Sequence, residues 1–217
     1  MSTNSYTKTR FSANDTALVL SDHQSGIMQL VNDYSLAEFR NNVMGLAKLG
    51  KVFNLPTVLT TSLGHGPNGP FLPEVVSMFP DVPVIDRPRI ISAWDDPAFV
   101  AAVEKTGRKN LIMACVTIDV CLAFAAMQAV EAGYNVYGVV DASGANEVTI
   151  RENAVSRMKD HGIVPINWTT VGAELQRNWT SPTGQALGRV FHDHYHSLGL
   201  LMDSFEFTTA NAVKKAA

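Results

Sequence analysis

Cysteine is scarce in this chain of 217 residues: only Cys115 and Cys121 occur. Two cysteines so close in sequence cannot supply a disulfide framework, and such a chain is typical of a reducing compartment. The sequence also has no uncharged apolar run of the roughly 18 residues needed to cross a bilayer. Its N-terminus lacks the cationic and apolar segments of a secretory signal. These absences predict a cytoplasmic protein with no membrane partner.

Clusters of basic residues are absent as well. Lys and Arg number 17 against 20 Asp and Glu, which gives a net charge of −3. A nucleic-acid-binding surface needs concentrated positive charge, so we expect no nucleic-acid partner. The composition, 46% hydrophobic and 17% charged, is that of one ordinary globular domain with a full core. Small neutral or weakly charged molecules are left as the expected partners.

Short apolar segments alternate with amphipathic ones along the chain. The apolar segments predict strands at 16–21, 56–61, 82–85, 111–116, 135–140 and 162–168. Helical spacing predicts helices at 34–53, 96–106, 121–133 and 149–161, with a short helix ending at residue 78. Because the strands are too apolar to face water, this alternation predicts a three-layer α/β/α fold around a doubly wound, mostly parallel, six-stranded sheet.

Capping residues fix several expected helix ends. N-terminal signals occur at Ser35 with Glu38, at Asp96 before Pro97, at Thr149 with Glu152, and at Ser181-Pro182; Gly133 is the expected C-terminal stop of the 121–133 helix.

From Val171 onward the strand–helix alternation stops and the sequence predicts helices only. We therefore divide the chain into an N-terminal arm (1–12), an α/β domain (13–170) and a helical C-terminal extension (171–217). The extension contains more apolar side chains than a finished three-layer core needs, which predicts an interface between copies. These side chains are Leu187, Val190, Phe191, Leu198, Leu200, Leu201, Met202, Phe205 and Phe207.

Three polar residues follow the expected strands at their C-terminal ends, where doubly wound sheets bind ligands. Asp22, Arg87 and Cys121 come after the first, third and fourth strands. Cys121 is expected in the first turn of a helix, where free N–H groups and the helix dipole favour a thiolate and can receive an oxyanion. The alternative is that Cys121 is a small apolar residue packed in that helix.

The spaced motifs together resemble the isochorismatase-like cysteine hydrolases, over roughly residues 13–170. Each motif is weak alone, but their order is specific. The resemblance is carried by Asp22 and Gln24, by Asn68-Gly69-Pro70, by Arg87 with Ser92-Ala93-Trp94, by Asp119-Val120-Cys121, and by Asp141-Ala142. The segment 91–99 and the C-terminal extension resemble most the YcaC-type branch of bacterial hydrolases, which assemble as octamers.

The resemblance implies a catalytic triad of Asp22, Arg87 and Cys121, in which the carboxylate takes the thiol proton and the cysteine attacks an amide-like carbon. It implies a cis peptide bond between Val116 and Thr117, with the oxyanion hole formed there and at Cys121. It also implies a substrate pocket lined by Gln24, Asn68, Phe71 and Trp94.

Arg87 departs from the family, which usually has lysine at this position. Arginine does not deprotonate in proteins, so it can hold Asp22 ionised but cannot shuttle a proton. Two smaller departures occur near the nucleophile: Cys115 stands where glycine is common, and the hydroxyl of Thr117 comes one place early. Both are expected to reshape the pocket.

No metal or other cofactor is expected. A family metal centre needs an Asp and two His after the second strand, where only His65 occurs, and His23 beside Asp22 does not complete one. The run His192, His194 and His196 has zinc-like composition, but alternate residues of a helix point to different sides, so a solvated or interface helix is the better interpretation.

Two functional hypotheses follow. In the first, the protein is a cysteine hydrolase that cleaves the C–N bond of a small amide or carbamoyl compound. In the second, it is a catalytically impaired small-molecule-binding or assembly protein on the same scaffold, with Arg87 marking lost chemistry. The intact Asp22 and Cys121 favour the hydrolase. The resemblance also implies self-association as an octamer of two tetrameric rings.

Overall fold

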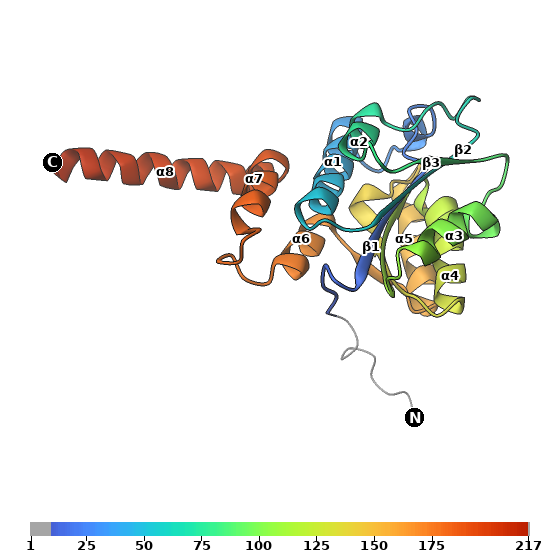
Figure 1. Cartoon of the computed structure of the whole chain (residues 1–217). Coiled ribbons are helices and arrows are strands. Elements are labelled where there is room, and N and C mark those ends of the chain that lie inside the picture. Colours follow the sequence, from blue (N-terminus) through green and yellow to red (C-terminus); the bar gives the residue numbers. More distant parts are fainter. Residues whose placement is uncertain (1–9, 217) are drawn as a thin grey trace.

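The computed structural model describes the backbone of residues 10–216 and the side chains of residues 10–210. Most of the predicted N-terminal arm therefore lies outside the described residues. The rest of the chain forms a sheet covered by helices on both faces, with a helical arm at the C-terminal end (Figure 1).

The sheet has six strands, all parallel, in the order β3-β2-β1-β4-β5-β6. The strands are β1 (Thr16–Ser21), β2 (Thr57–Ser62), β3 (Val84–Arg87), β4 (Asn110–Cys115), β5 (Asn135–Val139) and β6 (Val164–Ile166). The strands β1 and β4 are buried along their whole length, which explains their continuous apolar sequences. The predicted three-layer, doubly wound fold is confirmed.

Helices cover the sheet in two layers. The main helices are α1 (Leu36–Val52), α2 (Pro73–Met78), α3 (Pro97–Lys105), α4 (Ala123–Glu131), α5 (Val148–Asp160), α6 (Trp168–Gln176), α7 (Gly184–His194) and α8 (His196–Ala216). One core cluster joins the sheet to α1, α2, α6 and α7, and a second joins it to α3, α4 and α5. Short helical turns complete the connections: η2 (Ile27–Leu30), η3 (Ala93–Asp95), η4 (Ile118–Leu122) and η5 (Val140–Ala142).

The strand order reverses between β1 and β4, the first and fourth strands in sequence. Their register pairs Ser21 with Cys115, so both strands end at the same level. The segments that leave these strands carry Asp22 and Cys121, which places both residues at the switch point of the sheet.

Several predicted caps are confirmed. The Ser35 hydroxyl accepts a hydrogen bond from the amide of Glu38, and the Asp96 carboxylate accepts from two amides of α3. Gly133 follows α4 with φ +87°, a left-handed conformation that glycine adopts without strain. Sequence spacing alone was sufficient to predict these caps, because each cap residue and the group it contacts lie within one helical turn.

Other predicted boundaries are wrong. Thr149 lies inside α5, whose N-cap residue is Glu147, and that end has no side-chain cap. The sixth strand is shorter than predicted, because Trp168 begins α6 and donates its amide to the Asp141 carboxylate. The helix expected after Pro182 begins at Gly184. For the sixth strand, Asp141 lies far from Trp168 in sequence, so the local pattern could not reveal their hydrogen bond.

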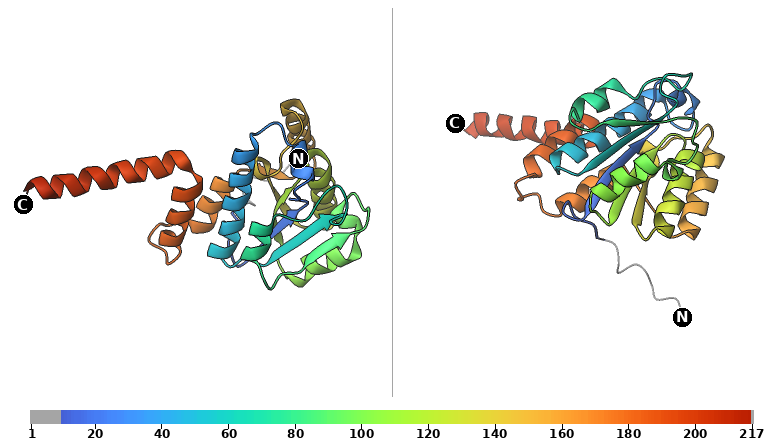
Figure 2. Two further views of the ribbon diagram at one scale, coloured as in Figure 1. Left: turned by 90° about the horizontal axis from the view of Figure 1, so that it is seen from above. Right: turned by 45° about the vertical axis from the view of Figure 1, so that its right-hand side comes forward.

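The C-terminal extension has two parts. The side chains of Leu187, Val190 and Phe191 are buried in the core formed with α1, so the prediction that they are surplus to the core is wrong for these three. By contrast, α8 projects away from the body in every view (Figures 1 and 2). The part of the extension available for an interface is therefore centred on α8.

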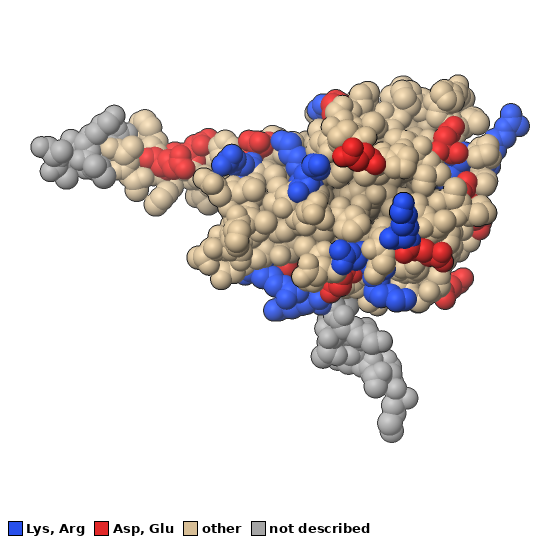
Figure 3. Space-filling model, in the orientation of Figure 1, with Lys and Arg blue, Asp and Glu red and all other residues tan. Residues whose placement is uncertain are grey.

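Charged side chains are scattered over the face of the molecule drawn in Figure 3. On the face drawn in Figure 3, acidic and basic side chains lie singly or in small mixed groups among uncharged residues. Within residues 10–216, no helix has both the length and the apolar character to span a membrane.

Candidate active site

Asp22 occupies the position directly after β1, where the backbone takes the left-handed conformation with φ 59°. This conformation is unfavourable for residues other than glycine and is often found at functional sites. The Asp22 amide donates to the carbonyl oxygen of Thr60 at 2.9 Å, which fixes the turn against β2. The side chain is completely buried, so its carboxylate must be held by protein groups.

Arg87 is the hydrogen-bonding partner of the Asp22 carboxylate. Its Nη2 lies 3.0 and 2.9 Å from the two carboxylate oxygens of Asp22, and its Nη1 donates to the hydroxyls of Ser21 and Thr60 at 3.2 and 2.9 Å. Thr60 in turn donates to the carbonyl oxygen of Ile85 at 2.7 Å. Both charged side chains have no exposed surface. The guanidinium therefore reaches from the end of β3 past β2 to Asp22.

Ser21 and Thr60 were missed by the sequence reasoning. Ser21 ends β1 and Thr60 pairs with it in β2, so a register prediction combined with the position of Arg87 could have drawn attention to them. Both hydroxyls are buried and hold the guanidinium by acceptor contacts that a lysine in this position could not all satisfy in the same planar geometry.

Cys121 lies in η4, a π-type turn between β4 and α4, rather than in the first turn of a regular α-helix. The Leu122 amide donates to the carbonyl oxygen of Thr117 at 3.1 Å, which closes this wide turn. Such turns are rare and are frequently found at functional sites. The peptide bond between Val116 and Thr117 is cis. The Cys121 side chain is partly exposed, whereas that of Cys115 is completely buried.

Two features of the folded site act against the thiolate that the helix terminus was expected to favour at Cys121. Burial raises the pKa of the Cys121 thiol, and the neighbouring Asp22 carboxylate raises it further. The Arg87 guanidinium is engaged by Asp22, Ser21 and Thr60. Both effects favour the protonated thiol, which would have to lose its proton during a reaction.

Asp22 is suited to accept that proton. Burial raises the pKa of the Asp22 carboxyl above its ordinary value, while Arg87 opposes this rise and the Cys121 thiol lowers the pKa as a hydrogen-bonding neighbour. A carboxylate whose pKa lies closer to neutrality is a stronger base than an exposed one. The geometry thus brings together a thiol, an adjacent carboxylate and a cation that holds the carboxylate in place.

Gln24, Asn68 and Phe71 stabilise the loop that follows β2. The Gln24 amide donates to the carbonyl oxygens of Ser62 and Gly69 and accepts from the Ser62 amide, at 3.1, 2.6 and 2.9 Å. Asn68 donates to the same Ser62 carbonyl at 2.7 Å, and Phe71 forms a β-bridge with Gln24 and is buried. These residues tie the 63–72 loop to the ends of β1 and β2, so their packing does not support direct substrate contact by Gln24.

Trp94 packs against aromatic side chains of α3 and of the segment after α4. Its ring packs edge-on against Phe99 at 5.9 Å and against Tyr134 at 5.5 Å between ring centroids. Tyr134 follows the C-terminal end of α4, whereas Cys121 precedes the N-terminal end of that helix. The local sequence around Trp94 could not show this, because the connection after β3 passes along α4. The packing therefore does not support Trp94 as a wall of the Cys121 pocket in the same chain.

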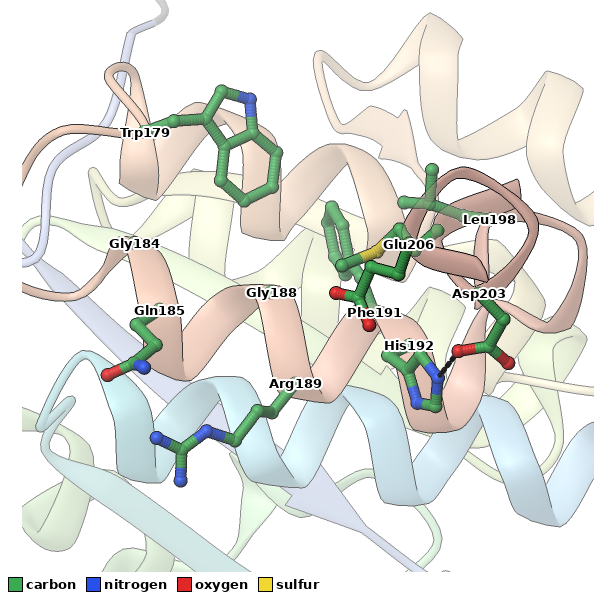
Figure 4. A pocket seen from close by; sticks show the side chains of 11 residues that line it. Trp179, Gly184, Gln185, Gly188, Arg189, Phe191, His192, Leu198, Asp203 and Glu206 are labelled. Carbon is green, nitrogen blue, oxygen red and sulfur yellow. Dashed lines mark hydrogen bonds and ion pairs between the residues drawn. The ribbon is translucent and has the colours of Figure 1, made fainter. Parts of the chain in front are cut away.

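Among the described residues, no group of three or more His, Cys, Asp or Glu side chains could hold a metal ion. The histidines at positions 192, 194 and 196 have different surroundings. His192 Nε2 is 2.9 Å from a carboxylate oxygen of Asp203 (Figure 4), and His194 Nδ1 is 2.8 Å from the amide oxygen of Asn41. His196 begins α8.

His23 follows Asp22 and is completely buried. Its Nε2 lies 2.9 Å from the carbonyl oxygen of Ala142, to which it donates, and in the described part of the chain its Nδ1 has no hydrogen-bond partner. Burial lowers the pKa of His23 from 6.5 to about 4. The imidazole is therefore neutral near pH 7 and packs between Phe39 and Phe71.

This histidine predicts a pH-dependent stability. Because the pKa of His23 is lower in the folded state, the unfolded chain binds a proton first as the pH falls from about 6.5 to about 4. The contribution of the neutral imidazole to the free energy of unfolding is complete above this pH range. About 3 kcal/mol of it is lost as the pH falls through the range. We expect His23→Gln to remove most of that slope in urea unfolding at several pH values. The exposed His161→Gln is the control, and an unchanged slope in His23→Gln would contradict the assignment.

Comparison with known proteins defines the class. Residues 16–170 match the isochorismatase domain family. The chain therefore belongs to the isochorismatase family of hydrolases. Over 201 residues it is 45% identical to the probable hydrolase YcaC of Escherichia coli strain K12, and the alignment covers 92% of this chain and 96% of that protein.

Two solved structures of YcaC proteins are similar along nearly their whole length. The YcaC protein of Pseudomonas aeruginosa, described with hexane-2,5-diol and covalent acrylamide, is 45% identical, with a TM-score of 0.89 and coverage of 92% of this chain and 98% of that one. The E. coli YcaC structure, described as an octameric hydrolase of unknown specificity, is 44% identical, with a TM-score of 0.89 and coverage of 92% and 97%.

Proposed function

We propose that this protein is a cysteine hydrolase that cleaves the C–N bond of a small amide or carbamoyl compound. The observation that carries the proposal is the position of the partly exposed Cys121 thiol beside the Asp22 carboxylate, which Arg87 holds through both oxygens. This arrangement gives a nucleophile and its base within a site that excludes most water.

The reaction follows from these groups. Asp22 takes the thiol proton as the Cys121 sulfur bonds to the substrate carbonyl carbon, and negative charge develops on the carbonyl oxygen. Backbone N–H groups of the 116–121 segment are the proposed donors to that oxygen. Collapse of this tetrahedral intermediate breaks the C–N bond, and the proton held by Asp22 passes to the leaving nitrogen. Water then attacks the thioester and gives a proton to Asp22. The C–S bond breaks, and Asp22 returns that proton to the Cys121 sulfur as the acid product leaves.

Arg87 has an electrostatic role in this scheme. It keeps Asp22 ionised and oriented while the carboxylate accepts a proton, and it does not itself exchange one. The engagement of both terminal guanidinium nitrogens is consistent with that role, because four hydrogen bonds fix its plane. The arginine therefore replaces the lysine of the family without removing the charge on which the base depends.

A test that needs no known substrate uses acrylamide, because the P. aeruginosa relative is described with covalent acrylamide. We expect acrylamide to add to Cys121 of the folded chain and not to the fully buried Cys115. Peptide mapping by mass spectrometry identifies the modified residue. We further expect Asp22→Asn to slow the addition, since the thiol would lose its base. Modification of Cys115 first, or an inert Cys121, would contradict the proposed nucleophile.

The substrate class is tested by measuring the product that is released. A panel of small amides, ureides and carbamoyl compounds is incubated with the enzyme, and ammonia or amine release is measured. Turnover that Cys121→Ala abolishes supports the hydrolase. Binding of panel members without turnover would instead favour a small-molecule-binding protein on this scaffold.

We also propose that the chain self-associates, as the octameric E. coli relative does. Support comes from α8, whose apolar side chains Leu200, Leu201, Phe205 and Phe207 are exposed in the single chain. Closed symmetric assemblies are the rule for such interfaces. Light scattering at micromolar concentration should give a mass well above the 23.5 kDa of one chain, and a monomer mass would contradict the proposal.

A further inference from the structure

The backbone amide of Thr117 faces the sulfur of Cys121. Burial has the largest effect on the Cys121 thiol and raises its pKa, whereas the Thr117 N–H group donates towards the sulfur and lowers this pKa. When the sulfur bonds to a carbonyl carbon, the carbonyl oxygen lies on the atom next to the sulfur, within reach of the same N–H group. The direction of the Thr117 N–H group therefore decides how well the charge on that oxygen is stabilised.

The amides on both sides of Thr117 are already engaged, and they fix this direction. The Val116 amide donates to the carbonyl oxygen of Ser21 at 3.2 Å, and the Ile118 amide donates to the carbonyl oxygen of Gly144 at 3.0 Å. The first acceptor belongs to the neighbouring strand β1, which lies inside the sheet. The second belongs to the loop between η5 and α5, so the position of that loop controls one side of the Thr117 amide.

Ser143 holds the same loop against the end of β4. Its hydroxyl accepts a hydrogen bond from the Cys115 amide at 3.0 Å, and the residue has no exposed surface. The Ser143 amide donates to the carbonyl oxygen of Val140 at 3.1 Å, which fixes the turn after β5. The register of β4 with β5 ends at the pair of Met113 and Gly138. Beyond that pair, the Ser143 hydroxyl provides the acceptor for β4 in place of a strand.

Asp33 anchors the loop from its other side. Its carboxylate accepts from the Ala145 amide at 2.9 Å and from Nη1 of Arg151 at 3.1 Å, and its side chain has no exposed surface. The Arg151 guanidinium also lies over the Tyr34 ring, 4.7 Å from the ring centroid. The Ala145 carbonyl oxygen accepts from the amides of Asn32 and Asp33 at 2.9 and 3.2 Å. The loop 143–145 is thus held at both ends.

We propose that Ser143 is a positioning residue of the hydrolytic reaction, which aims the Thr117 N–H group at the developing oxyanion through the loop 143–145, and that Asp33 fixes this loop. Neither side chain contacts the substrate in this arrangement. Each acts through backbone groups that hold the segment before Cys121. The inference rests on the proposed function and identifies two residues outside the triad that set the geometry of its oxyanion site.

Two reagents separate the oxyanion site from the reactivity of the thiol. With p-nitrophenyl acetate, the Cys121 sulfur bonds to the carbonyl carbon, charge develops on the carbonyl oxygen, the thiol proton passes to Asp22, and p-nitrophenolate leaves. With iodoacetamide, the sulfur displaces iodide from the methylene carbon, the proton again passes to Asp22, and the carbonyl oxygen gains no charge. A misplaced oxyanion donor therefore slows the first reagent alone, whereas a less reactive thiol slows both.

The experiment measures both rates at Cys121 of the full chain, from the burst of p-nitrophenolate and from peptide mapping of the alkylated residue. Removal of one oxyanion donor costs about 100-fold or more, so we expect its misplacement in Ser143→Ala to slow acetylation by about tenfold or more and to leave alkylation within about twofold. Asp33→Ala should act in the same direction. Asp33→Asn keeps an acceptor for the Ala145 amide and should have a smaller effect.

Thr16→Val is the matched control, because it removes a buried hydroxyl at the opposite end of the sheet and should change neither rate. Asp22→Asn should slow both reagents. Urea unfolding checks that each variant is folded, and Asp33→Ala decides the question if Ser143→Ala does not fold.

Equal slowing of the two reagents, or unchanged acetylation in the folded Ser143→Ala and Asp33→Ala variants, would overturn the positioning role. A different result would refute the proposed function itself. If the wild-type chain gave no burst beyond that of Cys121→Ala, Cys121 would not be an acylated nucleophile, and the positioning role would fall with it.

Discussion

Replacing Cys121 by alanine should abolish covalent chemistry, and Asp22→Asn should lower kcat/KM by at least about 100-fold. The reason is that each variant removes one of the two atoms between which the proton moves. Alanine has no nucleophile, and the asparagine amide keeps the shape of Asp22 but cannot accept the thiol proton. The measurements are product release on a substrate from the amide panel and the rate of acrylamide addition to Cys121.

The matched control is Cys115→Ala. Cys115 is the other thiol of the chain and is completely buried, so its loss should reduce stability but leave the reaction in place. Wild-type turnover in both Cys121→Ala and Asp22→Asn would refute the hydrolase mechanism. The Asp22, Arg87 and Cys121 constellation would then be inherited scaffold, and the small-molecule-binding alternative would stand.

The second large effect is expected at Arg87. Arg87→Met leaves Asp22 buried without its cation, and breaking a fully buried pair costs about 3–5 kcal/mol. The pKa of Asp22 should rise further, so the carboxyl would be protonated near neutral pH and the base would be lost. Activity and acrylamide addition should fall about 100-fold or more and should recover only as the pH is raised.

Arg87→Lys distinguishes charge from geometry. It keeps a cation beside Asp22 but loses the planar contacts to Ser21 and Thr60, so we expect activity within about tenfold of wild type. Arg40→Met is the control for removing an arginine from an ion pair, because its pair with Glu74 is exposed and should contribute little to stability. If Arg87→Met matched wild type in its activity–pH profile, the electrostatic role of Arg87 would be wrong.

The sequence predicted the fold because each element is specified locally. Continuous apolar strands such as Thr16–Ser21 and the caps at Ser35 and Asp96 depend on neighbours within a few residues. The ordered motifs also identified the family, which the comparisons confirm. Strand ends that converge at a switch point were enough to select Asp22, Arg87 and Cys121 as candidates.

Contacts between distant segments decided the rest. Spacing predicted a thiolate at Cys121, but burial and the Asp22 carboxylate, which depend on the packed sheet, raise the thiol pKa instead. Trp94 was expected in the pocket, yet the path of its loop along α4 brings it to Tyr134. Gln24 was expected to meet substrate, yet its amide is occupied by Ser62 and Gly69.

Contacts between distant segments also decide which apolar side chains of the C-terminal extension are buried. The sequence determined that residues beyond Val171 are helical and rich in apolar side chains. It could not determine which of these side chains the chain buries itself, because α7 and α8 have similar apolar content. Only the tertiary structure shows that Leu187 and Phe191 pack into the core with α1 while Phe205 and Phe207 remain exposed on α8. Local pattern fixes the secondary structure, and burial is a property of the assembled fold.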